Sequence, residues 1–369
     1  CHRILRYNNR NSEARFLYAA AEKELGNLDS ARRLFMDIAA DNYNFEASVI
    51  ELVKLDILMG YYKEAREFLE NNITVRTGYT DFLASICYRK EGLGEKARKI
   101  LENPCARDEF ILAELFCLGD SKDRQAFVDY TRGGASVVKT LALEYAALGL
   151  YEDAEKLLAT AKEKDVKIKL LSLYLSEKTG NPGFMLEDIT SVNIDYAFVN
   201  EKILVDVLEQ KKDLDGTGVL DYILGTWYYS VARKQEALEL FHRAYDKGLR
   251  YTVLLRNLGY AYYSYKKDYD AAARYFEEDL AVNGGGNADS FTYLDMIYRE
   301  KGDLESRKKL IPYMNQATNR SLVLPFLCGI YKDLGEEDKA LEILSREEFE
   351  VWENKELSGR VYWDVMLSL

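Results

Sequence analysis

Apolar residues recur along this chain at intervals of three and four positions, which is the spacing of one face of an α-helix. No segment alternates strictly between apolar and polar residues, and no pair of such segments is joined by an Asn-Gly hairpin. Only four prolines occur in the whole chain, so long helices can continue without interruption. The pattern therefore predicts an all-α protein in which strands are essentially absent.

The helical pattern is organised into repeated pairs of helices. Each first helix carries a large apolar residue, a small residue and an aromatic one, and each second helix carries an alanine and another large residue. In the clearest pair, Leu258, Gly259 and Tyr262 precede Ala272 and Phe276. The turn of this pair is one residue longer than the regular repeat spacing. The other pairs are marked by Tyr18, Ala19, Gly26, Leu28, Ala31 and Phe35; by Gly60, Tyr62, Ala65 and Leu69; by Ser85, Tyr88, Gly92, Ala97 and Leu101; by Ala142, Tyr145, Gly149, Tyr151, Ala154, Leu158 and Ala161; by Leu224, Gly225, Tyr228, Ala237, Phe241 and Ala244; by Leu294, Tyr298, Gly302 and Leu304; and by Leu327, Cys328, Tyr331, Gly335, Ala340 and Leu344.

A glycine recurs at the turn between the two helices of a pair. Such a turn needs a left-handed residue, which glycine adopts without the cost that other residues meet. An acidic residue usually follows, as in Gly302-Asp303 and Gly335-Glu336, where it is placed to cap the next helix and to meet its positive dipole. We therefore interpret acidic clusters such as Glu336, Glu337 and Asp338 as helix starts rather than catalytic carboxylates.

Two stretches keep helical spacing without the full repeat signature, about residues 107–131 and about 167–190. The stretch from Thr190 to Gly218 is the least repetitive and contains break signals around one helix. We expect an N-terminal array over 1–190 with two degenerate helical pairs. An irregular connecting segment with one helix follows over 191–218, and a C-terminal array that ends in an incomplete repeat spans 219–369.

These marker residues and their spacing resemble the tetratricopeptide repeat (TPR) superfamily, and the resemblance covers nearly the whole chain. It implies a TPR-like α-α superhelix, a solenoid of antiparallel helix pairs. In that superfamily the concave face commonly holds an extended peptide, and asparagine and arginine of the first helices bond its backbone or carboxylate.

The C-terminal part resembles a narrower group. The segments "LDYILGTWYYSVARKQEALELFHRA", "LLRNLGYAYYSYKKDYDAAARYFEEDL" and "REEFEVWENKELSGRVYW" are similar to the TPR region of large uncharacterised bacterial proteins. Those proteins carry an N-terminal β-rich, carbohydrate-related domain before the repeats. The resemblance implies that this chain is the helical portion of a longer bacterial protein, and that Leu369 ends inside a first helix without its partner.

Composition limits the classes of partner and the cellular compartment that are expected for this chain. The formal net charge of -12 and the pI near 5.0 repel nucleic-acid phosphates and anionic lipid, so neither nucleic acid nor a membrane is an expected partner. No apolar stretch approaches the roughly 18 residues of a membrane helix, and no signal peptide is visible. Five cysteines without paired spacing favour reduced thiols and a cytoplasmic location.

The first residue, Cys1, allows two interpretations. A mature bacterial lipoprotein begins with a lipid-bearing cysteine, but such an anchor normally precedes a flexible linker, and a helical pattern follows here at once. We therefore favour a piece cut from a longer protein. Cys87, Cys117 and Cys328 lie in apolar helical patterns and are interpreted as core residues.

Residues for catalysis or cofactor binding are scarce. Only His2 and His242 occur, which leaves almost no material for a histidine metal site or a catalytic triad, and His242 is expected at the surface. The glycine-rich stretch 284–287 lacks the strand and lysine of a phosphate loop, and 213–216 lacks the spacing and closing glutamate of a calcium loop. We expect an inter-repeat linker and a capping loop there, with no cofactor, no metal and no enzymatic activity.

The strongest compositional anomaly is the 28 tyrosines, of which many occupy internal repeat positions. The register assigns a smaller set to the concave face of the C-terminal array, where tyrosine offers rigid apolar area with a polar tip. The candidate binding residues are Tyr222, Tyr229, Arg256, Asn257, Tyr260 and Tyr263. An aromatic face that only packs or is solvated remains an equally weighted interpretation.

The leading functional hypothesis is a non-enzymatic scaffold whose concave groove binds a peptide segment, or the chain's own missing N-terminal domain. The alternative is a helical accessory region of a larger carbohydrate-active enzyme, for which an oligosaccharide would be the ligand. A third hypothesis, a peptide-sensing cytoplasmic regulator, needs an added DNA-binding or phosphatase-type element that the sequence does not show.

Overall fold

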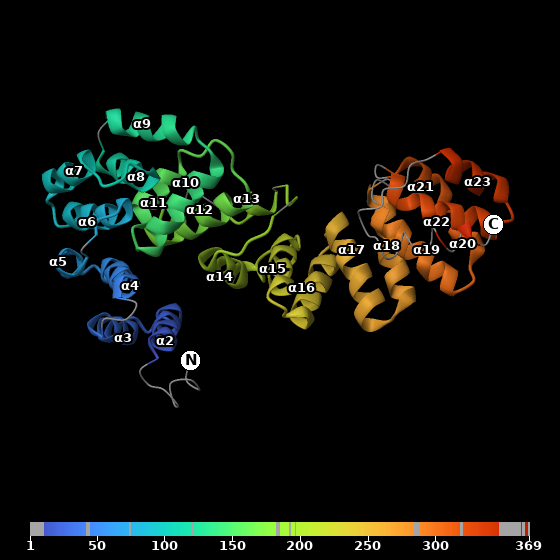
Figure 1. Cartoon of the computed structure of the whole chain (residues 1–369), viewed down its shortest axis with the longest axis horizontal. Coiled ribbons are helices and arrows are strands. Elements are labelled where there is room, and N and C mark those ends of the chain that lie inside the picture. The colour runs from blue at the N-terminus through green and yellow to red at the C-terminus, as the bar shows by residue number, and fades with distance from the viewer. Residues whose placement is uncertain are drawn as a thin grey trace. The chain divides into compact units, whose positions relative to one another are not determined.

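The computed structural model describes residues 11–41, 45–73, 75–119, 121–181, 185–191, 193–195, 197–283, 288–317, 320–346, 363 and 366–367. Over these residues the regular structure is helical and no strand occurs, which confirms the predicted all-α class. Consecutive helices pack as pairs, such as α2 with α3 and α15 with α16 (Figure 1). Cys1, His2, residues 284–287 and the segment around Trp352 lie outside the described residues.

The chain separates by its internal contacts into an N-terminal unit, residues 1–207, and a C-terminal unit, residues 208–369. The helices of the N-terminal unit are α2 (Ser12–Glu24), α3 (Leu28–Ala40), α4 (Phe45–Leu58), α5 (Tyr62–Asn72), α6 (Gly78–Lys90), α7 (Gly94–Glu102), α8 (Glu109–Leu118), α9 (Ser121–Thr131), α10 (Ala135–Ala147), α11 (Tyr151–Leu158), α12 (Val166–Thr179) and α13 (Glu187–Thr190). Helices α8 and α9 pack against each other, as do α12 and the short α13.

The division between the two units falls within α14 (Lys202–Lys211), which is the one helix among the described residues of 191–218. The C-terminal unit continues with α15 (Val219–Ser230), α16 (Lys234–Asp246), α17 (Thr252–Ala261), the π-helix η1 (Tyr262–Lys266), α18 (Tyr269–Asn283), α19 (Ala288–Glu300), α20 (Leu304–Lys308), α21 (Ile311–Gln316), α22 (Arg320–Asp333) and α23 (Glu337–Arg346).

Small residues stand where two helices of a pair touch. A Cβ atom added to Gly225 would lie 2.7 Å from the Phe241 ring, and one added to Gly259 would lie 2.7 Å from the Phe276 ring. The alanine position of the second helices is buried completely at Ala31, Ala65, Ala97, Ala154, Ala237, Ala272 and Ala340. The predicted register is therefore confirmed in both units.

The turns between paired helices contain a left-handed residue, as predicted. Gly26, Gly60, Gly92, Gly149, Gly302 and Gly335 all have φ between 67° and 81°. At two turns a residue other than glycine takes the same conformation, Ala232 with φ 64° and Lys267 with φ 57°. The predicted acidic cap occurs at Asp303, whose carboxylate accepts the backbone N–H of Ser306, and Asp268 accepts the N–H of Ala271 in the same way.

Arginines join successive helix pairs of the N-terminal unit. The residue after the buried alanine is an arginine in three second helices, and each arginine reaches a carboxylate further along the chain. These ion pairs are Arg32 with Asp56 at 2.5 Å, Arg66 with Glu91 at 2.7 Å and Arg98 with Asp123 at 3.0 Å. Because several of these carboxylates are largely buried, pairing offsets the cost of removing their charge from water.

A buried polar network holds the middle of the N-terminal unit. Glu114 on α8 is fully buried, and its carboxylate accepts hydrogen bonds from Arg89 at 2.5 Å and from the Tyr145 hydroxyl at 2.7 Å. Arg89 also donates to Asp153 at 2.9 Å, and Lys90 lies 3.2 Å from the same carboxylate. Four helices, α6, α8, α10 and α11, are thereby tied to one set of charges.

One pair of the C-terminal unit departs from the alanine rule. Gly302 is followed five residues later by Arg307, at the position where the other turns lead to a buried alanine. Arg307 is nevertheless buried and donates to Asp295 at 2.7 Å and to Asp333. A guanidinium needs more room than a methyl group, and the second helix here is broken into the short α20 and α21.

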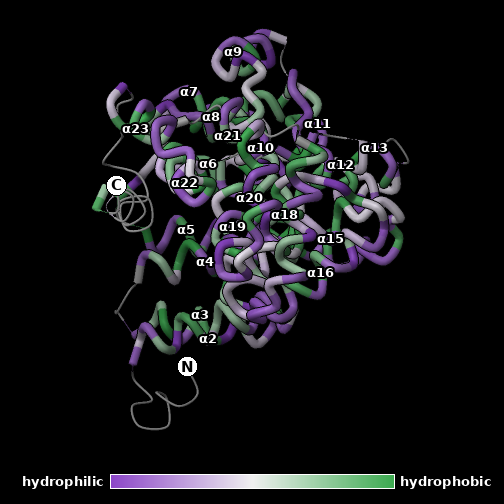
Figure 2. The backbone as a smooth tube through the Cα atoms, turned by 90° about the vertical axis from the view of Figure 1, so that its right-hand side faces the viewer, coloured by the Kyte–Doolittle hydropathy of each residue, from purple (hydrophilic) through white to green (hydrophobic). Residues whose placement is uncertain are grey.

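Hydrophobic and hydrophilic residues are interspersed along the helices, as the tube in Figure 2 shows. No helix in the described part of the chain is long and apolar enough to cross a membrane. Cys87 and Cys328 are buried as predicted, whereas Cys117 is only partly buried.

Candidate functional site

A cavity of about 370 Å³ opens in the C-terminal unit between the α15–α16 pair and the start of the next pair. Its walls come from the end of α15, the first turns of α16, the last turns of α17, and η1. We call it the tyrosine pocket, and its lining residues are Tyr229, Lys234, Gln235, Leu238, Phe241, Asn257, Tyr260, Ala261, Tyr265 and Lys266.

Close helix packing positions the walls of the pocket. Gly225 lets α15 approach the Phe241 ring on α16, and Gly259 lets α17 approach the Phe276 ring on α18. Phe241 and the partly buried Leu238 then form an apolar base on α16. Because neither glycine has a side chain, both first helices lie deep against their partners and their outer tyrosines stand at the rim.

The π-helix η1 brings the last wall into place. In the pairs that contain Tyr88, Tyr145, Tyr228 and Tyr298, the left-handed turn residue comes four positions after the tyrosine. After Tyr262 it comes five positions later, at Lys267, and the extra residue is accommodated as one π-helical turn. Such insertions into α-helices occur frequently at functional sites. Here it carries Tyr265 and Lys266 into the pocket lining.

Three tyrosines at the rim remain substantially exposed: Tyr229 by 43%, Tyr260 by 38% and Tyr265 by 48%. The Tyr260 and Tyr265 rings meet edge to face with centroids 5.9 Å apart. The hydroxyl oxygens of Tyr229 and Tyr265 lie 3.5 Å apart, which links α15 to η1. The rim therefore combines accessible aromatic faces with polar tips.

Lys234 gives the pocket its electrostatic character. Its ammonium donates to the Tyr265 hydroxyl at 3.1 Å and lies 4.6 Å from the centroid of the same ring. The hydrogen bonds from Tyr229 and Lys234 lower the pKa of Tyr265 below its ordinary value of 10.0. The same hydrogen bond with Tyr265 raises the pKa of Tyr229 to about 12. Tyr229 is accordingly a neutral hydrogen-bonding group at physiological pH.

The structure brings together three of the six residues predicted for the concave face. Tyr229, Asn257 and Tyr260 line the pocket. Tyr222 is only 5% exposed, because its ring packs against Phe241 and Tyr251.

The remaining two predicted residues also lie outside the pocket lining. Arg256 donates to Asp289 at 2.9 Å, and Tyr263 packs its ring against Tyr269 and Tyr293 in the core of the next pair.

Tyr265, Lys234 and Lys266 are pocket residues that the sequence analysis did not identify. The extra residue at this turn was visible, but the register alone does not say whether a loop or a π-helix absorbs it. His242 is half-buried rather than at the surface, with its Nε2 3.1 Å from the Tyr262 hydroxyl. Burial lowers the pKa of His242.

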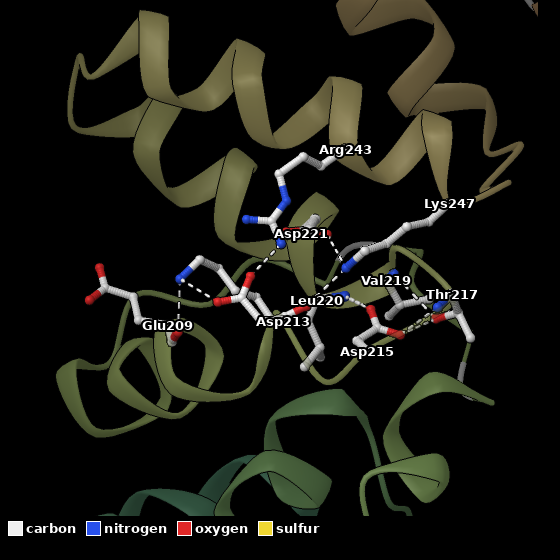
Figure 3. A network of polar contacts seen from close by, with 10 residues as sticks. Glu209, Asp213, Asp215, Thr217, Val219, Leu220, Asp221, Arg243 and Lys247 are labelled. Carbon is white, nitrogen blue, oxygen red and sulfur yellow. Dashed lines mark hydrogen bonds and ion pairs between the residues drawn. The ribbon is translucent and has the colours of Figure 1, made fainter.

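A second polar cluster of the C-terminal unit lies around the start of α15 (Figure 3). Asp215 accepts from the backbone N–H groups of Thr217 at 2.7 Å and Leu220 at 2.9 Å, so this loop caps a helix as predicted. The fully buried Asp221 lies 2.6 Å from the Lys247 ammonium and 3.4 Å from the Arg243 guanidinium. The pKa of Asp221 is raised by burial, which both cations oppose. The charges are matched internally, so we assign the cluster a structural role.

No group of three metal-ligating side chains occurs within the part of the chain that the structure describes. The tyrosine pocket has hydrogen-bond donors and aromatic surface but no histidine, cysteine or carboxylate in its lining. Its arrangement suits noncovalent binding.

No protein-family model and no curated protein matches this sequence. Solved structures similar to it include a chain of the APC/C hetero-tetramer Cut9-Hcn1, with 14% identity, 96% of this chain and 76% of that chain covered, and a TM-score of 0.35. Yeast Tom70 is 10% identical to this chain, with 99% of this chain and 90% of that chain covered and a TM-score of 0.27. A tetratricopeptide repeat protein from Parabacteroides merdae is 14% identical, with 80% of this chain and 97% of that chain covered and a TM-score of 0.25.

The fold is TPR-like. The chain's own helix pairs carry this assignment, through the buried alanine of each regular second helix and the left-handed turn before it. In the TPR-like frame, the tyrosine pocket lies between one helix pair and the next.

Proposed function

We propose that this chain is a non-enzymatic interaction scaffold whose C-terminal unit binds a peptide segment of a partner in the tyrosine pocket. The partner is another protein or a neighbouring domain. The observation that carries the proposal is the cavity of about 370 Å³ rimmed by Tyr229, Tyr260 and Tyr265, each of them more than a third exposed.

The size and lining of the pocket support a peptide ligand. Binding pockets of this order of volume, roughly 300–1,000 Å³, bury most of a small ligand or one or two side chains. Leu238, Phe241 and Ala261 provide apolar surface for a side chain, and Asn257 and Gln235 provide amides that can bond a peptide backbone. Exposed tyrosines beside such a base are typical of residues that dominate binding energy.

The experiment uses a random linear-peptide display library selected on the full chain, followed by calorimetry with synthetic copies of the enriched peptides. Tyr229→Ala and Tyr260→Ala should each weaken binding by about tenfold or more, because each removes a rim ring. Tyr313→Ala is the matched control, since Tyr313 is 40% exposed on α21 and lies outside the pocket lining. Failure to enrich any peptide, or equal loss in all three variants, would overturn the proposal.

A second candidate ligand is an oligosaccharide, bound by a chain that serves as the helical accessory region of a carbohydrate-active enzyme. The exposed faces of the same three tyrosines favour it, because sugar rings stack on aromatic faces. A glycan array probed with the full chain distinguishes the two candidates. Glycan binding that Tyr260→Ala abolishes, together with no enriched peptide, would select this alternative.

A further inference from the structure

Over the described ranges, the two lysines of the tyrosine pocket lack the carboxylate partners that several other cations of the C-terminal unit have. Elsewhere in this unit, Lys247 pairs with Asp221 at 2.6 Å, Arg250 with Glu278 at 2.6 Å and Arg256 with Asp289 at 2.9 Å. Figure 3 shows the first of these pairs. Within the described residues, neither Lys234 nor Lys266 forms an ion pair with a carboxylate. Two lysines therefore remain available at one cavity of an otherwise acidic protein.

The pocket lining contains no carboxylate, although the chain carries 62 acidic residues against 50 basic ones. Lys234 donates instead to the Tyr265 hydroxyl at 3.1 Å, and Lys266 belongs to the adjacent π-helical turn. The ammonium of Lys234 is thus held at the rim by a phenolic hydroxyl and not by a carboxylate. A ligand carboxylate placed there would gain a charge-assisted hydrogen bond without displacing a carboxylate of the protein.

The apolar base adds a second requirement for the ligand. Phe241 is buried on α16, and Leu238 lies one turn before it on the same helix. Beside them, the Tyr229 and Tyr260 rings stand half-open to solvent. A ligand that carried only charge would leave this surface without a partner, whereas an apolar side chain would cover it.

We propose that the tyrosine pocket recognises an acidic segment of a partner protein, in which an aliphatic or aromatic side chain lies on the apolar base and a neighbouring Asp or Glu carboxylate meets Lys234 and Lys266. This inference rests on the proposed peptide-binding function and specifies its ligand. Charge complementarity and the two-part lining decide in favour of a peptide that alternates apolar and acidic residues.

The test begins with the peptides enriched from the random display library on the full chain. Acidic residues next to an apolar residue should be over-represented among them. Each enriched peptide is then compared by calorimetry with an analogue in which Gln and Asn replace Glu and Asp. The amide analogue should bind about twofold to fivefold more weakly, which is the range expected for exposed ion pairs.

Lysine variants connect this preference to the pocket. Lys234→Gln and Lys266→Gln should each weaken binding of the acidic peptide by about twofold to fivefold and leave binding of the amide analogue unchanged. Lys308→Gln serves as the control, because Lys308 is an exposed lysine on α20 outside the pocket lining. Raising the salt concentration should weaken binding of the acidic peptide more than binding of its amide analogue, because salt screens the attraction between the carboxylate and the lysine.

The outcomes separate the two proposals. Enriched peptides that require Tyr260 but bind equally as amide analogues, without any effect of the lysine variants, would overturn the acidic preference and leave peptide binding intact. Absence of enriched peptides would overturn the proposed function itself. Binding of an oligoglucuronate that depends on Lys234, in the absence of any peptide binding, would show that the carboxylate comes from a sugar and overturn the peptide ligand.

Discussion

A single side chain decides how closely two paired helices approach. At Gly259 a Cβ atom would lie 2.7 Å from a carbon of the buried Phe276 ring, which cannot swing away as a flexible side chain would. At Gly94, on α7, an added Cβ meets nothing within 4 Å and the backbone is ordinary helix.

These two glycines should therefore respond oppositely to alanine. We expect Gly259→Ala to destabilise the C-terminal unit by about 1–3 kcal/mol, the usual cost of overpacking a core contact. Gly94→Ala should be neutral or stabilising by up to about 1 kcal/mol, because alanine is the better helix former. Urea denaturation followed by circular dichroism measures both. Equal effects would mean that α17 does not pack against Phe276 as described.

Charges buried in the N-terminal unit predict a pH dependence. Burial raises the pKa of Asp153, but the attraction of Arg89 and Lys90 outweighs it and lowers that pKa below its ordinary value of 3.8. A carboxyl with a lowered folded-state pKa contributes stability above its unfolded-state pKa and loses this contribution as the pH falls through the folded value.

Asp153→Asn should thus destabilise the protein by roughly 1–3 kcal/mol at pH 7, the range for hydrogen bonds to charged groups. The difference between parent and variant should shrink between pH 7 and a pH well below 3.8, because the contribution of the carboxyl is lost as it becomes protonated. Denaturant titrations at the two pH values give this difference. Asp206→Asn, at an exposed pair with Lys202, should change stability little at either pH. A difference for Asp153→Asn that grows on acidification would contradict the assigned sign.

Packing residues were predicted from the sequence more accurately than binding residues. Ala154 and Ala237 are fully buried as expected, because the repeat spacing places them on the inner side of a helix whatever surrounds it. Tyr222 and Tyr260 were both assigned to the concave face, yet the first is buried against Phe241 and the second is 38% exposed. That distinction depends on neighbouring helices, which the spacing of one helix does not describe.

At the scale of elements, the feature that shapes the candidate site is η1. The sequence showed one residue too many between Tyr262 and the alanine of the next helix, and a loop insertion was an equally valid reading. The π-helix became visible only in the structure, where Tyr262–Lys266 stay helical and the left-handed turn residue is Lys267.

Deletion of Ser264 should convert η1 into regular α-helix. Removing one residue rotates the following side chain by about 100° around the helix, so Tyr265 would leave the pocket. We expect loss of binding to the enriched peptides in calorimetry, with a thermal melt that is unchanged or slightly higher. Tyr265→Ala, which keeps the π-helix, should weaken binding only partly. A deletion variant that binds as tightly as the parent would show that η1 does not build the site.

At the scale of the molecule, the extent of the C-terminal unit remains a prediction. The repeat pattern places its start at residue 219, whereas internal contacts place it at 208. The hydroxyl of Tyr228 donates to Glu209 at 2.8 Å, and Arg243 donates to Asp213 at 2.6 Å, so side chains before 219 contact the first pair.

We accordingly expect a fragment of residues 200–369 to be more stable than a fragment of residues 219–369. The shorter fragment lacks Glu209 and Asp213, which are partners of Tyr228 and Arg243. Thermal melts of the two fragments, followed by circular dichroism, compare them directly. Identical melts would place the boundary at 219 and make α14 a connecting element.

The central claim is that the C-terminal unit binds a partner segment in the tyrosine pocket. Hydrogen–deuterium exchange of the full chain, with and without the tightest enriched peptide, tests it most directly. The account predicts slowed exchange concentrated in the end of α15, the first turns of α16, and the segment from Asn257 to Lys267. Binding accompanied by slowed exchange elsewhere, with these segments unchanged, would contradict it.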